Sequence, residues 1–218
     1  MCPRPYNLGK RQAAAGATRL RIVEAARQLL ADESNTAELS MDAIARKADV
    51  SRLTIYYQFG SRPGLLEALY DHLAARGNMR RMAEVFHEAD AAKMLEKMVQ
   101  VFVGFWASDP VVLRRLRAMS GLDPEIAAGI QSRDSRRAQI SAAIVRRFVS
   151  AGQNAPPAEQ KLAADALSML TSFETYDAMS RAGHADERIQ RTLLDLARTT
   201  LNSLSRGPNE SEESSSKL

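Results

Sequence analysis

Residues 40–69 read SMDAIARKADVSRLTIYYQFGSRPGLLEAL, and this stretch decides the fold. A short helix begins behind Ser40, a residue type that caps helices, and Ile44 gives it a narrow apolar face. The turn that follows places Asp49 where one residue must be left-handed, a conformation that aspartate tolerates better than most residues. Ser51 can cap the next helix. This order of elements predicts a helix-turn-helix.

The second helix of this motif, residues 52–59, has two faces of different kinds. Ile55 and Phe59 stand four positions apart and turn inward. The other positions carry a guanidinium, a hydroxyl, two phenols and an amide, on Arg52, Thr54, Tyr56, Tyr57 and Gln58. Arginine can pair with guanine, and the other groups can reach base edges or phosphate oxygens. A solvated polar helix is the alternative, but the turn and the caps have the spacing of a helix that enters the major groove.

Residues 18–76 resemble the N-terminal domain of the TetR family of transcriptional regulators. The matching stretches are RLRIVEAARQLL, LSMDAIARKADVS and TIYYQF-GS-R followed by GLLEAL. The family commonly has a small residue or proline where this chain has Leu53, a histidine at Gln58, and a lysine followed by an acid at Arg62-Pro63. Leu53 and Gln58 lie on the second helix of the motif, so these two departures bear on the operator sequence and not on the docking mode, whereas Arg62 keeps a phosphate-facing charge. The resemblance implies DNA contacts by Ser40, Arg52, Leu53, Thr54, Tyr56, Tyr57, Gln58 and Arg62.

The charge is uneven along the chain, whose formal net charge is +4. The basic excess lies in residues 1–81, which contain the motif, as phosphate binding requires. We expect an all-α fold in four segments. These are a flexible N-terminal arm at 1–17, a three-helix DNA-binding domain at 18–76, a helical ligand-binding and dimerisation domain at 77–205, and a disordered tail at 206–218.

Apolar spacing predicts helices throughout the second domain. One long helix runs from residue 82 or 84 to residue 107, and Asp109-Pro110 and Asp123-Pro124 each open a helix. Another helix follows Pro156-Pro157 and runs to residue 183. The last begins at residue 185 or 186 and extends to about residue 204.

The last two helices are apolar on more than one side, which one neighbouring helix cannot cover. The alternative is a pair of central core helices. Because TetR-family dimers form through a four-helix bundle of this kind, the resemblance favours a homodimer. Its seam would contain Leu193 and Leu196, or Leu194 and Leu201, depending on which face turns outward. Two copies would read a palindromic double-stranded operator.

A set of soft and flat apolar side chains is either plain core or the lining of an effector cavity. The resemblance favours the second reading, because the family's C-terminal domain usually holds a small-molecule effector. The candidate lining residues are Met98, Phe102, Phe105, Trp106, Met119, Phe173 and Tyr176. The effector would be small and apolar or amphipathic.

We expect no catalytic residues, no cofactor and no metal site. His72, His87 and His184 stand alone, and Cys2 is the only cysteine in the sequence. No apolar stretch is long enough to cross a membrane and the N-terminus has no signal segment, so we expect a cytoplasmic chain with no membrane partner. The sequence thus predicts a homodimeric repressor released by an effector. The alternative is an architectural or partner-recruiting DNA-binding protein without an effector.

Overall fold

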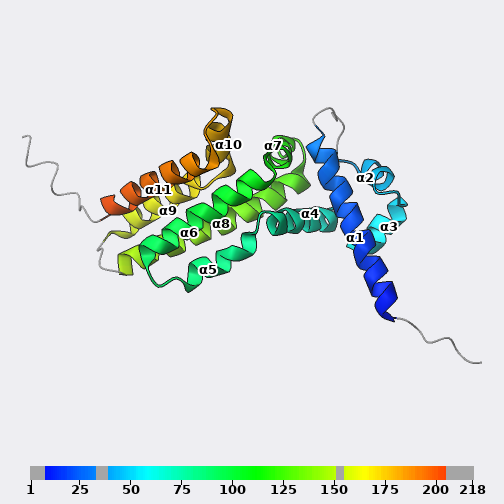
Figure 1. Ribbon diagram of the computed structural model, residues 1–218, viewed down its shortest axis with the longest axis horizontal. Coiled ribbons are helices and arrows are strands. Elements are labelled where there is room, and N and C mark those ends of the chain that lie inside the picture. The colour runs from blue at the N-terminus through cyan, green and yellow to red at the C-terminus, as the bar shows by residue number, and fades with distance from the viewer. Residues whose placement is uncertain (1–7, 33–38, 151–154, 205–218) are drawn as a thin grey trace, which may run out of the picture. The chain divides into compact units, whose positions relative to one another are not determined.

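A computed structural model describes residues 8–32, 39–150 and 155–204, which form helices and turns without a strand (Figure 1). The all-α prediction is confirmed. The elements are α1 Leu8–Ala31, α2 Met41–Lys47, α3 Arg52–Phe59, α4 Arg62–Arg76, η1 Met79–Arg81, α5 Met82–His87, α6 Ala91–Ser108, α7 Pro110–Met119, α8 Pro124–Ser150, α9 Pro157–Leu170, α10 Phe173–Arg181 and α11 Asp186–Ser203. Cys2 and the predicted tail lie outside the described residues.

Helix α1 begins at Leu8, well before residue 18, where the sequence predicts the first domain to start. Residues 12–17 are helical although their side chains are exposed, so they gain little from packing. Three consecutive alanines in this segment explain the helix, because alanine has the highest helix propensity. Part of the predicted arm therefore extends the first helix.

The chain divides into two compact units. Unit 1 comprises the described residues up to Leu73 together with Arg114–Gly129, and unit 2 comprises Ala74–Leu113 with the described residues from Ile130 onward. Helices α4, α7 and α8 thus contribute residues to both units. The sequence predicts a single boundary after residue 76 instead. Contacts distant in sequence explain the difference: in unit 1, for example, the Tyr70 hydroxyl donates to the Ile126 carbonyl across 3.1 Å.

The helix-turn-helix of unit 1 forms as its sequence predicts. The Ser40 hydroxyl caps α2 by accepting from the Ala43 amide at 3.2 Å, and Ser51 accepts from the Thr54 amide at 3.0 Å. Asp49 takes the left-handed conformation with φ 51°. Helix α1 packs on α2 and α3, and Ile22, Ile44 and Ile55 are buried between the three helices. Burial of these apolar side chains holds α3 in place.

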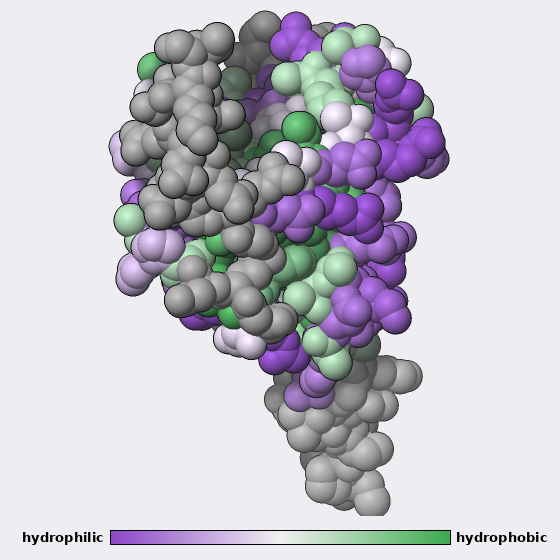
Figure 2. Space-filling model, turned by 90° about the vertical axis from the view of Figure 1, so that its left-hand side faces the viewer, coloured by the Kyte–Doolittle hydropathy of each residue, from purple (hydrophilic) through white to green (hydrophobic). Residues whose placement is uncertain are grey.

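Unit 2 is built around α6, which packs against α5, α10 and α11, while α11 also packs against α9 and α10. The buried residues of α6 and α11 follow helical spacing. They are Met94, Leu95, Met98, Val99, Val101, Phe102, Val103 and Trp106 on α6, and Ile189, Leu193, Leu194, Ala197 and Leu201 on α11. Figure 2 shows hydrophilic residues over much of the described surface at the end of unit 2 where α11 finishes, with hydrophobic residues between them.

Two helices that the sequence predicts as continuous are each broken. The segment from residue 82 to residue 107 contains α5 and α6, because Asp90 leaves the helix and caps α6 by accepting from the Lys93 amide at 2.9 Å. The helix predicted to end at residue 183 contains α9 and α10. Here Ser172 caps α10 by accepting from the Thr175 amide at 3.2 Å. Serine and aspartate favour caps over helix interiors because their side chains compete for backbone groups.

Two glycines allow close packing within the units. At Gly77, which follows α4 as predicted, an added Cβ would lie 2.4 Å from Cδ2 of Phe105. At Gly129, an added Cβ would lie 2.4 Å from Cε2 of Tyr70. Any larger residue would push these aromatic rings away, so both positions require glycine for packing and not for backbone conformation.

Candidate functional site

Helix α3 of unit 1 has a buried face and an open face. Ile55 is 0% exposed, whereas Leu53 is 77% and Tyr57 is 87% exposed. Ser51 fixes the start of the helix, and its hydroxyl also lies 2.8 Å from that of Thr54. A leucine and a tyrosine left in water gain no burial energy within the chain. The open face is therefore suited to contacts outside it.

The guanidinium of Arg52 lies in a small polar cluster on this open face. Its Nη1 atom is 3.4 Å from Oδ2 of Asp42, at the start of α2, and its Nη2 atom is 3.3 Å from the Tyr56 hydroxyl. The Arg52 guanidinium also lies 5.7 Å from the centre of the Tyr56 ring. These contacts are long and exposed, so they are weak. They orient the arginine, and a contact with DNA could replace them. Arg52 thus remains available to a guanine edge or a phosphate.

The C-terminal end of α3 is held from α1. The Arg19 guanidinium lies 4.2 Å from the centre of the Phe59 ring, and its Nη1 donates to the Gln58 carbonyl at 2.7 Å. Ser40, Thr54 and Gln58 are half-buried, while Tyr56 is exposed. Six of the predicted DNA contacts thus lie on one helix, with Ser40 at the cap of α2.

Arg62 differs from its predicted role. Its guanidinium binds Asp123, with 3.2 Å between Nη1 and Oδ1, and also Glu125 and the Leu39 carbonyl. Its hydrogen bonds hold the pKa of Asp123 below its usual range. We expected a phosphate-facing charge, but two carboxylates in the same unit satisfy it. These partners lie about sixty positions along the chain, beyond any local sequence signal.

Arg115 is a second arginine whose contacts with a distant part of the chain could not be predicted from the sequence. Its Nη1 donates to the carbonyls of Leu29 and Leu30 at 3.3 and 3.4 Å, and also to that of Asp32. These carbonyls end α1, where helix geometry leaves acceptors without partners and the dipole favours a cation. Arg115 therefore fixes the C-terminal turn of α1 within unit 1.

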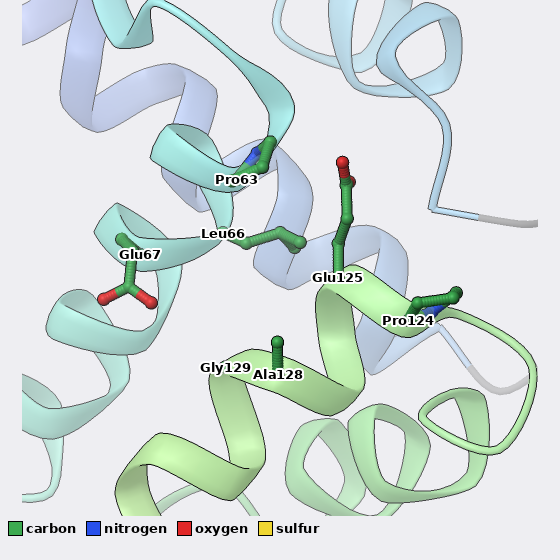
Figure 3. A pocket seen from close by; sticks show the side chains of 7 residues that line it. All are labelled: Pro63, Leu66, Glu67, Pro124, Glu125, Ala128 and Gly129. Atoms are coloured by element: carbon green, nitrogen blue, oxygen red, sulfur yellow. The ribbon is translucent and has the colours of Figure 1, made fainter.

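Open grooves of unit 1 surround the helix-turn-helix and the start of α4. One, of about 570 Å³, has Arg52 and Tyr56 in its wall together with Met119 and the 94% exposed Leu122. Another, of about 630 Å³, runs along the turn between α2 and α3 and also reaches Arg52. A third, of about 340 Å³, lies between the first turns of α4 and α8, and Figure 3 shows the side chains of Leu66 and Ala128 directed into this space. The first two grooves border α3.

Comparison with known proteins agrees with this geometry. The model of the bacterial regulatory proteins of the tetR family matches residues 22–69, which include the helix-turn-helix. The HTH-type transcriptional regulator AlkX of Mycobacterium tuberculosis is 28% identical over 180 residues, covering 70% of this chain and 82% of that protein. The chain belongs to the TetR family. It is accordingly a DNA-binding transcriptional regulator.

Solved TetR-like structures share the fold. A TetR-like regulator from Rhodococcus sp. RHA1 is 21% identical with a TM-score of 0.60, covering 92% of this chain and 99% of that one. A transcriptional regulator from Saccharomonospora viridis in complex with choline is 24% identical with a TM-score of 0.64, covering 84% and 96%. At these identities the likeness establishes the fold of the TetR-family chain and nothing further.

Most of the residues predicted to line an effector cavity lie in unit 2 of this TetR-family protein. Trp106 is their centre, with its ring centroid 6.2 Å from that of Phe102, 4.6 Å from that of Phe105 and 5.6 Å from that of Phe173. Met98 and Tyr176 are also buried in unit 2. Met119 does not join them, because it belongs to unit 1 and lines the groove beside α3.

Polar atoms of this TetR-family core have partners that the sequence analysis missed. The indole Nε1 of Trp106 donates to the Thr171 carbonyl at 3.0 Å. The Tyr176 hydroxyl lies 2.9 Å from Oδ1 of Asp186, and burial, with that carboxylate, raises the tyrosine pKa to about 12. The tyrosine is therefore a neutral donor. The signal available in the sequence was the general rule that buried Trp and Tyr find partners.

The described residues contain no group of three or more His, Cys, Asp or Glu residues placed to hold a metal ion. Within the same ranges, none of the helices combines the length and apolar character of a membrane span.

Proposed function

We propose that this TetR-family chain is a homodimeric, cytoplasmic repressor that leaves a palindromic operator when a small apolar or amphipathic effector binds unit 2. The open face of α3 carries this proposal, since Leu53 and Tyr57 have no packing role within unit 1. The proposed DNA contacts are Ser40, Arg52, Leu53, Thr54, Tyr56, Tyr57 and Gln58. Arg62 would act differently, by fixing the start of α4 through Asp123.

The exposed apolar residues of α9 and α11 support a dimer. Leu162 and Met169 on α9 are 64% and 62% exposed, and Leu196 on the adjacent α11 is 48% exposed. The two seams considered from the sequence contain four leucines, of which Leu193, Leu194 and Leu201 are buried within their own chain and Leu196 is exposed. Leu196 would therefore face the second copy.

A pair of glutamate substitutions tests this dimer. Leu196→Glu should leave the fold intact and separate the dimer, because a charge would be buried in the interface. Leu194→Glu should unfold unit 2 instead. Light scattering and far-ultraviolet circular dichroism on both variants distinguish these results. A folded, fully dimeric Leu196→Glu variant would place the interface elsewhere.

The aromatic core around Trp106 supports effector binding in unit 2. Methionine and flat aromatic side chains can shift to admit guests of irregular shape. The S. viridis relative of this fold is described in complex with choline, so the fold can hold a small molecule. Because α7 and α8 contribute residues to both units, a guest that displaced their unit 2 portions would also displace their unit 1 portions.

Release of DNA by a compound is the decisive observation for this function. A thermal-shift screen with lipophilic compounds should find saturable stabilisation, and the same compounds should release a fluorescent operator. A protein without an effector, such as an architectural DNA-binding protein, would bind the operator and respond to no compound. Stabilisation without DNA release would separate binding from regulation.

A further inference from the structure

Helix α8 buries two polar side chains one turn apart in unit 2. Arg137 is 8% exposed and Ser141 is 0% exposed. Residues four positions apart lie on the same face of a helix, so both side chains enter the unit on one side of α8. Within the described part of the chain, the Ser141 hydroxyl is fully buried and has no hydrogen-bond partner.

The polar groups near Arg137 are, by contrast, matched. The Arg137 guanidinium donates from Nε to the Ser168 carbonyl at 3.1 Å and from Nη1 to Asp134 at 2.7 Å. The Thr171 hydroxyl donates to the Leu167 carbonyl at 2.8 Å. Near the end of α9, the Arg137 side chain thus satisfies one of the carbonyls that helix geometry can leave without a donor. Ser141 is the exception to this pattern.

A buried hydroxyl without a partner destabilises the protein that contains it, and alanine would remove the cost at little loss of volume. We propose that the missing partner of Ser141 is a neutral carbonyl oxygen of the effector. This inference rests on the proposed effector site in unit 2. It adds the chemical class of the guest: an apolar ketone, ester or lactone whose oxygen accepts from the Ser141 hydroxyl.

The charge balance around Ser141 decides whether its partner is a neutral carbonyl or a charged carboxylate. Arg137 is already paired with Asp134, so its positive charge is balanced where it is buried. A carboxylate beside Ser141 would enter the core without a cation of its own, which is costly. A neutral oxygen incurs no such penalty, and the buried apolar neighbours Ile144 and Val145 suit the hydrocarbon part of such a guest.

The test uses the full chain and two probes of nearly equal shape. Methyl hexyl ketone carries the carbonyl oxygen, and its methylidene analogue carries a methylene group in that place. Wild-type protein should bind the ketone about tenfold more tightly than the analogue in titrations followed by thermal shift. Octanoate should bind more weakly than the ketone.

The Ser141→Ala variant should be more stable than the wild type and less selective between the two probes. Its melting temperature without ligand should rise by about 2–4 °C, since the unpaired hydroxyl is gone. Its preference for the ketone over the analogue should disappear. Ser172→Ala is the matched control: it removes a buried hydroxyl that caps α10, so it should lower the melting temperature and keep the ketone preference.

Two outcomes overturn the carbonyl inference, and a third overturns the effector site with it. Equal binding of ketone and analogue by the wild-type chain overturns the carbonyl inference and leaves the effector site standing. An unchanged or lower melting temperature in Ser141→Ala means that the hydroxyl has a partner in the free protein, which also overturns it. If neither probe gives saturable stabilisation, the effector site and the inference fail together.

Discussion

Unit 1 and unit 2 use aromatic side chains in opposite ways. Tyr57 on α3 is 87% exposed, whereas Trp106 in unit 2 is 6% exposed, and its indole is hydrogen-bonded to the Thr171 carbonyl. An exposed tyrosine adds little to folding, and a buried tryptophan is among the largest contributors to a core. The comparison teaches that one residue class is left open to contacts outside the chain in unit 1 and builds the core of unit 2.

The arginines differ in the same way. Arg52 makes long contacts at the surface of unit 1, and its side chain is 54% exposed. Arg137 is buried in unit 2, where its guanidinium meets a carbonyl and a carboxylate at short distances. Substitutions in the open face of α3 should therefore change DNA binding at constant stability. Substitutions in the core of unit 2 should change stability first.

The largest effect is expected at Trp106. Trp106→Ala should lower the free energy of unfolding by about 3–5 kcal/mol, because it leaves a cavity among the aromatic rings and removes the donor to Thr171. Tyr57→Ala, the same kind of truncation in unit 1, should change that free energy by about 0.5 kcal/mol or less. Urea denaturation of both variants measures the difference, and similar losses would break the comparison.

At Tyr57 the loss should appear in DNA binding instead. Tyr57→Ala should weaken operator binding by about tenfold or more, through loss of a phosphate contact by an exposed phenol. The loss should be similar for base-substituted operators, since phosphate contacts carry no sequence information. Fluorescence anisotropy on an operator series measures it. Retained affinity would place the DNA on another face of unit 1.

Arg52 tests whether the open face of α3 recognises the base sequence of the operator. Arg52→Ala should cost about 1–3 kcal/mol on the preferred operator and less on operators with a substituted base. Asp42→Asn, which removes the carboxylate partner of Arg52, serves as a companion variant that keeps the guanidinium. A uniform loss on every duplex for Arg52→Ala would make this residue a backbone contact.

The smallest effect concerns pH and the packing of α1 on α4 in unit 1. The Glu24 carboxylate accepts from Arg27 and lies 3.1 Å from Nε2 of His72, and these contacts, Arg27 foremost, lower its pKa from 4.5 to about 2. Because the pKa is lowered on folding, the stabilisation is complete above pH 4.5 and is lost as the pH falls toward about 2. The stability difference between wild type and Glu24→Gln should therefore shrink over that range. A difference independent of pH would exclude this carboxylate as its source.

Local signals were sufficient to predict much of the fold. Ser40, Asp49 and Ser51 specify caps and a turn by their own chemistry, and the structure confirms each. The break at Ser172 was missed because its apolar neighbours continue a helical pattern across it, and a cap in the middle of such a pattern is ambiguous.

Contacts between distant segments could not be predicted. Pairing of Arg62 with Asp123 depends on how α4 and the start of α8 pack in unit 1, which no local pattern encodes. The placement of Met119 in unit 1 could not be predicted either, because an apolar side chain could line a cavity in either unit. The burial of Ser141 could not be predicted either, since a serine in a helix is ordinarily exposed.

Selection of DNA from a random-sequence pool by the full chain tests the central claim most directly. A TetR-type dimer that reads DNA with α3 should enrich two inverted half-sites with centres about 10 base pairs, or a multiple of that spacing, apart. Tyr57→Ala should enrich the same half-sites much less strongly under the same conditions, because it loses affinity and not sequence preference. Enrichment of unrelated sequences without inverted symmetry, or an identical result with Tyr57→Ala, would contradict the account.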